Sequence, residues 1–413
     1  MISVATMRRV DRWLGVPACF ALTLLRRLRE PRVPPGRAEP RRIVFVKLAE
    51  QGSTVLAAQA IRRAIGLVGA GNVYFLVFEE NRAILDAMGL LPPANVVTIR
   101  TGSIARTIAG ALGAIARLRR AGIDTAIDLE FFARSSAALA YLSGARWRVG
   151  FHAFSGEASY RGDLMTHRLS FNSHLHTSLT FDSLVAALER DPASLPAFDF
   201  QPREDEAALP QFSPDASDVA AVRETLRALA GARAAAPLIL LNANASDLLP
   251  LRRWPAARYV ELARALLARH PEVLVAFTGA PIEAAAAEAL VRDIGSERAI
   301  SLAGRTTIRQ LLAAYGLAEV LVTNDSGPAH FAALTPIDVV TLFGPETPHL
   351  FRALTPRSHT IWAGLACSPC INAFNDRQSP CTNNVCMQVI TVDQVLEEVS
   401  RAYESRRARA VRH

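Results

Sequence analysis

Residues 319–345 constrain the fold of this chain more than any other segment. Two short apolar runs, at 320–322 and 339–343, are rich in β-branched residues and leave room between them for one short helix. This pattern predicts two buried parallel strands joined by a helix. The loop before that helix would turn backbone N–H groups towards an anion at the carboxyl edge of the sheet, although an ordinary α/β loop is the alternative. The loop residues are Asn324, Asp325, Ser326, Gly327 and Pro328.

The same alternation extends through most of the chain. Strand-like runs occur at 43–47, 73–78, 95–99, 125–129, 147–151, 238–241 and 273–277, and helical patterns at 55–65, 105–120, 256–268, 283–294 and 392–401. We therefore expect an α/β protein with parallel sheets. Because 413 residues exceed one typical core, we expect two domains, at 41–190 and 219–413. The proline-rich and acidic segment 191–218 is the expected linker, 49–54 the expected loop after the first strand, and 1–40 an extension.

The charge of the chain points to anionic surroundings. Its net charge is +8, which suits a nucleotide or a lipid headgroup layer. Nucleic acid is disfavoured, because the arginines are spread along amphipathic helices and are not interleaved with aromatic residues in one patch.

The extension contains an apolar run at 13–25 that is too short to span a membrane and is interrupted by Pro17. The basic residues after it argue against a signal peptide. Two interpretations stay open, an interfacial helix on an anionic membrane and a helix packed on the protein's own surface. The flanking arginines are Arg8, Arg9, Arg12, Arg26, Arg27 and Arg29.

Four cysteines form a C-x2-C-x10-C-x4-C cluster, namely Cys367, Cys370, Cys381 and Cys386. This spacing permits a structural zinc site, but a reduced thiol cluster and disulfides are also open. Disulfides rank last in a cytoplasmic protein. A catalytic zinc is disfavoured, because four protein ligands leave no open position on the metal.

Four motifs in a fixed order carry a resemblance to a known family. The segments RRIVFVKLAEQGSTVLAAQAIR, RRWPAARYVELARALL, TGAPIE and NDSGPAHFAA followed by VVTLFGPETP resemble glycosyltransferase family 9, the lipopolysaccharide heptosyltransferases, over about residues 42–400. The resemblance implies a GT-B fold of two Rossmann-like domains facing a cleft. It also implies an inverting enzyme that needs no metal or other cofactor. That enzyme would transfer a sugar such as heptose from a nucleotide-diphosphate sugar such as ADP-heptose to a cell-envelope glycan, at the cytoplasmic face of the plasma membrane.

One departure from the family concerns the catalytic base. The family's first loop reads approximately Lys-x-Ser-x-x-Gly-Asp, with the aspartate as the expected base, whereas this chain has Lys47, Ala49, Gly52 and Ser53. Glu50, three residues earlier, is our candidate replacement, with a solvated loop glutamate as the alternative. Lys47 is the second catalytic candidate, and Asp128 and Glu130 are the next candidate bases. If no carboxylate replaces the aspartate, the chain is a non-catalytic relative that binds sugar nucleotides or glycans. A dinucleotide-dependent oxidoreductase is disfavoured, because no G-x-G-x-x-G follows the first strand.

The resemblance also assigns the binding residues. Arg252 stands where the family has a donor-binding lysine, and a guanidinium can chelate a diphosphate at two points. The alternative is a surface arginine, and for Asn242 and Asn244 it is a pair of Asx turns. The expected donor site comprises Asn242, Asn244, Arg252, Thr278, Gly279, Asp325, Ser326, Gly327, Pro328 and His330. The expected acceptor site comprises Gly52, Ser53, Glu130 and Arg134.

Overall fold

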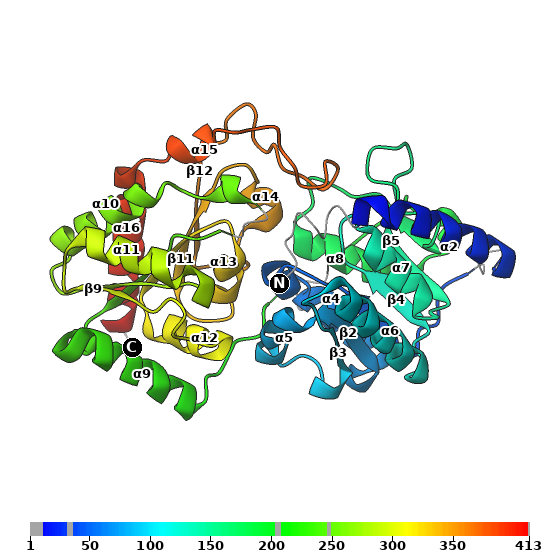
Figure 1. Cartoon of the computed structure of the whole chain (residues 1–413), viewed down its shortest axis with the longest axis horizontal. Coiled ribbons are helices and arrows are strands. Elements are labelled where there is room, and N and C mark those ends of the chain that lie inside the picture. The colour runs from blue at the N-terminus through cyan, green and yellow to red at the C-terminus, as the bar shows by residue number, and fades with distance from the viewer. Residues whose placement is uncertain (1–10, 31–35, 203–207, 246–248, 412–413) are drawn as a thin grey trace. The chain divides into compact units, whose positions relative to one another are not determined.

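The computed structural model describes residues 11–30, 36–202, 208–245 and 249–411. Arg8, Arg9, residues 31–35 of the expected extension and 203–207 of the expected linker lie outside the described residues. The chain divides into two compact units (Figure 1). Unit 1 comprises Met1–Pro210 with Asn372–Gln378, and unit 2 comprises Gln211–Ile371 with Ser379–His413. The first division point, between 210 and 211, falls inside the segment expected to be a linker.

Unit 1 is built on a six-stranded sheet in the order β3-β2-β1-β4-β5-β6, in which every strand runs parallel to its neighbours. All four residues of β1 and of β4 are buried, as expected for central strands covered on both faces. The strands are β1 Ile43–Val46, β2 Val73–Phe78, β3 Val96–Ile99, β4 Thr125–Asp128, β5 Trp147–Phe151 and β6 His167–Leu169.

Helices cover both faces of this sheet (Figure 1). Right-handed crossovers place α4 and α5 on one face and α6 and α7 on the other, because the direction of travel along the sheet reverses after β3. Helix α8 packs on α4, and α2 packs on α7. The helices are α2 Gly15–Arg29, α3 Gln51–Leu56, α4 Ala58–Val68, α5 Arg82–Met88, α6 Ile104–Arg120, α7 Arg134–Leu142 and α8 Thr177–Ala186.

Unit 2 repeats this architecture with the strand order β12-β11-β10-β7-β8-β9, and its neighbouring strands are again parallel. Its strands are β7 Leu238–Asn242, β8 Leu274–Phe277, β9 Ala299–Ser301, β10 Val320–Asn324, β11 Asp338–Phe343 and β12 Ser358–Trp362. Its helices are α9 Ala216–Ala230, α10 Ala256–Arg269, α11 Ala284–Ile294, α12 Ile308–Leu317, α13 Gly327–Ala332, α14 Pro348–Phe351, α15 Val385–Gln388 and α16 Val392–Val411. The two parallel sheets with flanking helices confirm the predicted α/β class.

The long helix α16 belongs to the core of unit 2. Val395, Val399 and Tyr403 are buried with residues of α10 and of the sheet in one apolar cluster. Helix α16 packs on α10, β10 and β11.

The first loop is shorter than predicted. The expected loop 49–54 is wrong, because α3 begins at Gln51 and α4 follows after Ala57. Glu50, directly before α3, has a φ of 67°, a left-handed conformation that non-glycine residues seldom adopt. This turn lets the chain pass from β1 into the helix within four residues.

The segment 13–25 forms most of α2, which has two different faces. Cys19, Thr23 and Arg26 are buried, and Cys19 joins the apolar cluster of unit 1. Phe20 and Leu24 are exposed. One side of the helix is therefore packed on the protein's own surface, while the other side faces solvent. In the part of the chain that the structure describes, no helix has the length and apolar character needed to cross a membrane.

Candidate functional site

Each sheet has one point where the strand order reverses, and polar side chains gather there. In unit 1 this point lies between β1 and β4, and in unit 2 between β7 and β10. In open α/β sheets, ligands bind at the carboxyl ends of the strands at such a switch point. Lys47 and Glu50 follow β1, and Glu130 follows β4. Asn242 ends β7, and Asp325 follows β10.

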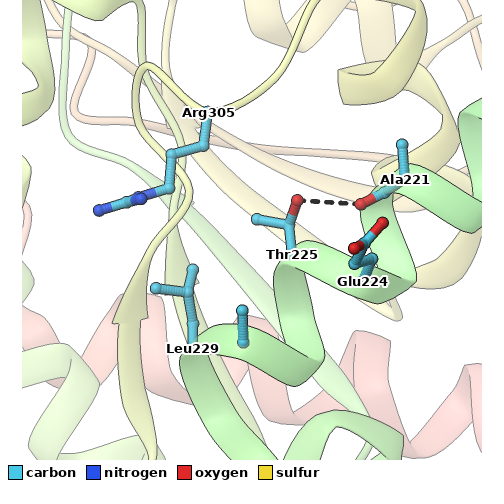
Figure 2. A pocket seen from close by; sticks show the side chains of 6 residues that line it. Ala221, Glu224, Thr225, Leu229 and Arg305 are labelled. Atoms are coloured by element: carbon cyan, nitrogen blue, oxygen red, sulfur yellow. Dashed lines mark hydrogen bonds between the residues drawn. The ribbon is translucent and has the colours of Figure 1, made fainter.

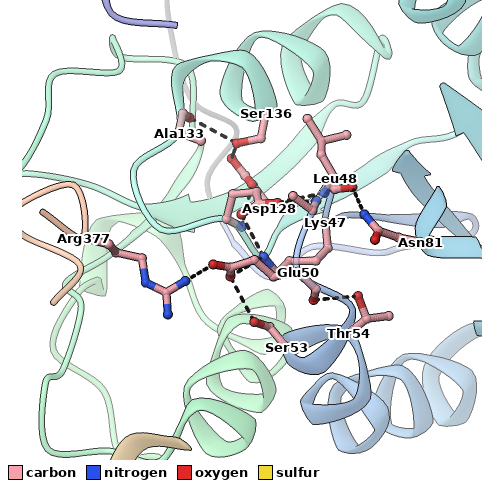
Figure 3. Close-up of polar contacts among 12 residues, drawn as sticks. Lys47, Leu48, Glu50, Ser53, Thr54, Asn81, Asp128, Ala133, Ser136 and Arg377 are labelled. Carbon is pink, nitrogen blue, oxygen red and sulfur yellow. Dashed lines mark hydrogen bonds and ion pairs between the residues drawn. The ribbon is translucent and has the colours of Figure 1, made fainter. Parts of the chain in front are cut away.

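Lys47 lies at the centre of the unit 1 cluster (Figure 3). Its side chain is fully buried, and its Nζ lies 2.9 Å from Glu130 Oε2 and 3.3 Å from Glu50 Oε2. Burial lowers the pKa of Lys47, and the neighbouring Glu130 carboxylate opposes that shift. Lys47 therefore holds the two carboxylates close together and does not extend into solvent.

Glu50 is held by three partners. Its Oε1 accepts an ion-paired hydrogen bond from Arg377, and its Oε2 contacts Lys47 and accepts a hydrogen bond from Ser53 Oγ at 3.1 Å. About a quarter of the side chain (26%) stays exposed. The contacts fix the side chain of a residue whose backbone is in a sparsely populated conformation, a combination often found at functional sites. The alternative of a freely solvated loop glutamate does not match this arrangement.

Glu130 and Asp128 support the loop from the end of β4. Glu130 Oε1 accepts hydrogen bonds from the backbone N–H groups of Leu48, at 2.8 Å, and Ala49, at 3.2 Å. Asp128 is fully buried, pairs with Arg161 and accepts a hydrogen bond from Ser136 Oγ at 2.9 Å. Burial raises the pKa of Asp128, and the Arg161 guanidinium opposes the shift. Of the two, Glu130 has more solvent contact, but its carboxylate holds the loop in place.

The structure separates the expected acceptor residues. Gly52 and Ser53 are buried in α3 directly beside Glu50, and Glu130 lies in the same cluster. Arg134 lies elsewhere: its guanidinium pairs with Asp11 at 3.3 Å, and its backbone oxygen accepts from Cys19 Sγ in α2. The structure therefore places Arg134 under the amino-terminal helix and not beside Glu50.

Segment 372–378, between Cys370 and Cys381, is part of unit 1. Arg377 binds Glu50, and Asp376 Oδ1 accepts a hydrogen bond from Ser159 Oγ at 2.6 Å. The ring of Phe374 packs against Phe171 and Phe132, with centroid distances of 5.5 Å and 6.0 Å. A short part of the cysteine-containing loop thus completes the cluster around the candidate base.

Arg252 lies at the centre of a second buried cluster, in unit 2. Its side chain is only 12% exposed, so it is not the surface arginine of the alternative interpretation. Nη2 lies 2.9 Å from Glu346 Oε1, Nη1 donates to the Asp325 carbonyl at 3.1 Å, and Nε lies 3.4 Å from Asp325 Oδ2. One guanidinium therefore faces two carboxyl groups.

The two carboxyl groups near Arg252 both have raised pKa values. Burial raises the pKa of Glu346 to about 8, with Arg252 opposing and Asp325 reinforcing the shift. Burial also raises the pKa of Asp325, again opposed by Arg252. Glu346 thus carries a proton through much of the neutral range, and the cluster avoids burying two negative charges beside one positive charge.

The expected donor residues at the ends of β7 and β8 are bonded to one another. Asn242 Nδ2 donates to the carbonyl and the hydroxyl of Thr278, each at 3.1 Å, and Asn242 Oδ1 accepts from Asn244 N at 3.3 Å. A Cβ on Gly279 would lie 2.9 Å from Asn244 Nδ2, so a larger residue there would have to displace the Asn244 side chain. Asn242 thus makes the turn of the alternative interpretation and also joins two strand ends.

The residues around α13 lie near Arg252, because Asp325, which precedes this helix, contacts the Arg252 guanidinium. Ser326 precedes the helix, and its hydroxyl donates to the Asn324 carbonyl at 3.1 Å. Gly327 and Pro328 form its first turn, and His330 is buried within it. Helix α13 has only six residues, so its dipole is a minor contribution to anion binding.

The four described cysteines are not joined by disulfide bonds. Cys367 and Cys381 are exposed, Cys386 is buried, and burial raises the pKa of the Cys386 thiol. Among the described residues, no group of three or more His, Cys, Asp or Glu side chains is arranged to hold a metal ion.

A pocket of about 390 Å³ lies on unit 2 between α9 and Arg305 (Figure 2). Thr225 Oγ1 donates to the Ala221 carbonyl at 2.9 Å, and Arg305 pairs with Glu288. None of its lining residues belongs to the two clusters described above, and we do not include it in the candidate site.

Sequence reasoning missed two residues of these clusters, Arg377 and Glu346, and the side-chain contacts of a third, Asn324. Arg377 contacts Glu50 across 327 positions of the chain, and no local pattern indicates such a pair. Glu346 follows β11, and its place in GPETP could have suggested a position at the carboxyl edge of the sheet. Asn324 joins three segments: its Oδ1 accepts from Trp254 N and Tyr259 OH, and its Nδ2 donates to the Asn244 carbonyl.

Comparison with known proteins agrees with this architecture. The chain is 27% identical over 157 residues to lipooligosaccharide heptosyltransferase 2 of Campylobacter jejuni, a match that covers 36% of this chain and 46% of that protein. The chain thus spans less than half the length of this curated relative. In fold, it resembles E. coli ADP-heptose lps heptosyltransferase II, with a TM-score of 0.64, 19% identity and coverage of 88% and 99% of the two chains. It also resembles the family 9 glycosyltransferase of Veillonella parvula, with a TM-score of 0.67, 18% identity and coverage of 89% and 99%.

These solved structures share the GT-B fold predicted from the motifs. At the level of sequence, residues 113–379, more than half of the chain, match the profile of glycosyltransferase family 9 (heptosyltransferase). The protein therefore belongs to glycosyltransferase family 9, the heptosyltransferase family.

Proposed function

We propose that the protein transfers a heptose from ADP-heptose to a hydroxyl group of a lipopolysaccharide-type glycan, with inversion at the anomeric carbon. The observation that carries this proposal is the Glu50 carboxylate, which lies at the unit 1 switch point and is fixed by Lys47, Ser53 and Arg377. Family membership supports a glycosyltransferase, and the similar E. coli protein is described as an ADP-heptose enzyme. The fold and the family thus supply the reaction class, and Glu50 supplies the missing base.

In the proposed reaction, Glu50 removes the proton from the acceptor hydroxyl. The acceptor oxygen attacks the anomeric carbon, a new C–O bond forms there, and the bond to the diphosphate oxygen breaks. ADP leaves with the electron pair of that bond, and the proton stays on Glu50 until solvent takes it. Ser53 and Lys47, which contact the second carboxylate oxygen, keep the base oriented.

The departing diphosphate needs positive charge, and we assign that role to Arg252. A guanidinium forms strong charge-assisted hydrogen bonds with phosphate. Because Arg252 already faces Asp325 and Glu346, the protonated form of Glu346 is the one compatible with an added anion. Asn244, Thr278, Gly279, Ser326, Gly327, Pro328 and His330 complete the proposed donor site, which requires no metal.

The proposed acceptor is part of the cell envelope, so we place the protein at the inner face of the plasma membrane, in the cytoplasm. A second candidate is a non-catalytic relative that binds sugar nucleotides. It is favoured by the absence of the family's usual aspartate after Gly52, where Ser53 stands. The two functions differ in one measurable property, the turnover of donor.

The test is Glu50→Gln, which keeps the shape of the side chain and removes its basicity. With ADP-heptose and a heptose-deficient lipopolysaccharide, ADP release should slow by about 10²- to 10⁴-fold, the usual contribution of a positioned base. Affinity for ADP should stay unchanged. The matched control is Glu79→Gln, which changes an exposed glutamate that pairs with Arg100 and should leave turnover unaffected.

Two results would contradict this assignment. Full turnover by Glu50→Gln would move the base to Glu130 or Asp128. A native protein that binds ADP but releases none from ADP-heptose would favour the non-catalytic relative.

A further inference from the structure

Three neighbouring helices of unit 1 form an outer layer with an unusual composition. Helices α2 and α6 both pack on α7, and residues of all three join one apolar cluster with the sheet (Figure 1). The opposite sides of α2 and α6 carry large apolar residues that no other part of the described chain covers. We call this solvent-exposed side of α2 and α6 the outer face.

Helix α6 carries a regular exposed apolar stripe. Ile104, Ile108 and Leu112 are spaced by four residues, so they lie along one side of the helix, and they are 47%, 55% and 62% exposed. Ala114 and Leu118 face the core instead. A single exposed apolar residue is ordinary, whereas three in a row along a helix indicate a contact surface.

Helix α2 repeats the pattern. Val16, Phe20, Leu24 and Leu28 also follow four-residue spacing, with exposures of 37%, 57%, 48% and 82%. Trp13, just before the helix, is 76% exposed. The other side of α2 is fixed to unit 1, because Cys19 Sγ donates to the Arg134 carbonyl and Thr23 Oγ1 accepts from Asp163 N. The exposed stripe is thus held on a firmly packed helix.

The acidic and basic side chains of the three helices are all basic. Helices α2, α6 and α7 contain three, four and one arginines, and none contains an aspartate or glutamate. The carboxylates next to α2 are already used, since Asp11 pairs with Arg134 and Glu30 pairs with Arg148. Arg120, at the end of α6, and Arg29, at the end of α2, are exposed.

We propose that the outer face of α2 and α6 binds an anionic lipid bilayer. Apolar stripes bordered by arginines, without acidic residues, match the two requirements of interfacial binding, which are apolar contact with the acyl boundary and attraction to anionic headgroups. A protein partner of the usual composition would not require an acid-free layer of three helices. The inference rests on the proposed function in one respect, because an envelope glycan acceptor lies at a membrane.

The test measures binding of the full chain to phosphatidylcholine vesicles with and without phosphatidylglycerol. We expect binding to the anionic vesicles that weakens with added salt. Phe20→Glu with Leu24→Glu, and separately Ile108→Glu with Leu112→Glu, should each lower the partition coefficient about tenfold or more, since each pair removes two exposed apolar side chains that the bilayer would bury. Ile282→Glu is the matched control, because Ile282 is 88% exposed but lies in unit 2.

Each result either supports or overturns the inference. Equal binding by the native protein and both double variants, or an equal loss with Ile282→Glu, would overturn it. So would self-association of the native protein without lipid that the double variants abolish, because the face would then be an interface between two copies. Circular dichroism checks that the variants fold. Lipid binding is read without any transfer, so a protein that binds vesicles but does not release ADP would contradict the proposed function alone.

Discussion

Glu346 offers a direct test of the buried cluster around Arg252. The side chain is fully buried, and one oxygen accepts from Arg252 Nη2 at 2.9 Å. Burial raises its pKa from 4.5 to about 8. Glu346→Gln retains the shape of the side chain and an acceptor oxygen for Arg252, but it cannot ionise. It therefore removes the pH dependence that this carboxyl group imposes on the unfolding free energy of unit 2.

The size of the effect follows from the pKa shift. Between pH 4.5 and 8 the folded protein keeps a proton on Glu346 that the unfolded chain has lost, so folding is favoured less as the pH rises. The slope is about 1.4 kcal/mol per pH unit. Relative to its value below pH 4.5, the contribution of Glu346 to the unfolding free energy has therefore fallen by about 3 kcal/mol at pH 7. The loss levels off above pH 8. Relative to the native protein, Glu346→Gln should thus gain stability steadily from pH 5 to pH 8.

Amide hydrogen exchange in β10 and β11 provides the measurement. The variant and the native protein are compared at each pH, so that the intrinsic pH dependence of exchange cancels. Glu288→Gln, which changes a half-exposed glutamate of the same unit, is the control. If the difference in free energy between Glu346→Gln and the native protein stays constant from pH 5 to pH 8, Glu346 is not held protonated by burial, and our account of the cluster fails.

Three further predictions concern individual ion pairs. Arg252→Ala should weaken ADP binding by about 1.5–3 kcal/mol, the range for hydrogen bonds to charged groups, and unchanged affinity in calorimetry would remove Arg252 from the donor site. Asp182→Ala removes the carboxylate that Arg63 contacts at 2.6 Å and 2.9 Å in the core of unit 1. Chemical denaturation should show a loss of about 3–5 kcal/mol, and a loss below about 1 kcal/mol would indicate that the pair contributes little. Arg377→Ala should speed amide exchange in 372–378 but not in β10; unchanged exchange would show that the ion pair with Glu50 does not hold the segment.

The sequence predicted secondary structure best for the most deeply buried strands. The central strands of both sheets are rich in apolar residues, because parallel strands are covered on both faces, and β1, β2, β4, β5, β7, β8, β10 and β11 were all predicted within a residue or two. The edge strands β6, β9 and β12 were missed. They are three to five residues long, and β12 is only half-buried, so the apolar signal is weak. Helices α7, α8 and α9 were also missed; α8 is buried almost all round, which erases the helical period.

Some residues of the candidate site could be placed from the sequence, and others could not. Residues at or shortly after the end of a predicted strand, such as Lys47, Glu50 and Asp325, could be placed at a carboxyl edge from the chain order alone. Arg377 could not, since its position depends on tertiary packing of a segment far away in sequence. The role of Arg134 in fixing the amino-terminal helix was hidden for the same reason, because its partner Asp11 precedes it by 123 residues.

Segment 372–378 also has a consequence for how the protein folds during synthesis. The aromatic rings of Phe132 and Phe171 in unit 1 receive Phe374 as a packing partner, and Glu50 receives Arg377. Residues 211–371, most of unit 2, are synthesised before either partner is made. Unit 1 therefore waits in an incomplete form, with part of its aromatic surface uncovered, until nearly the whole chain has been translated. Unit 1 is synthesised first, yet its contacts with Phe374 and Arg377 are among the last to form in the protein.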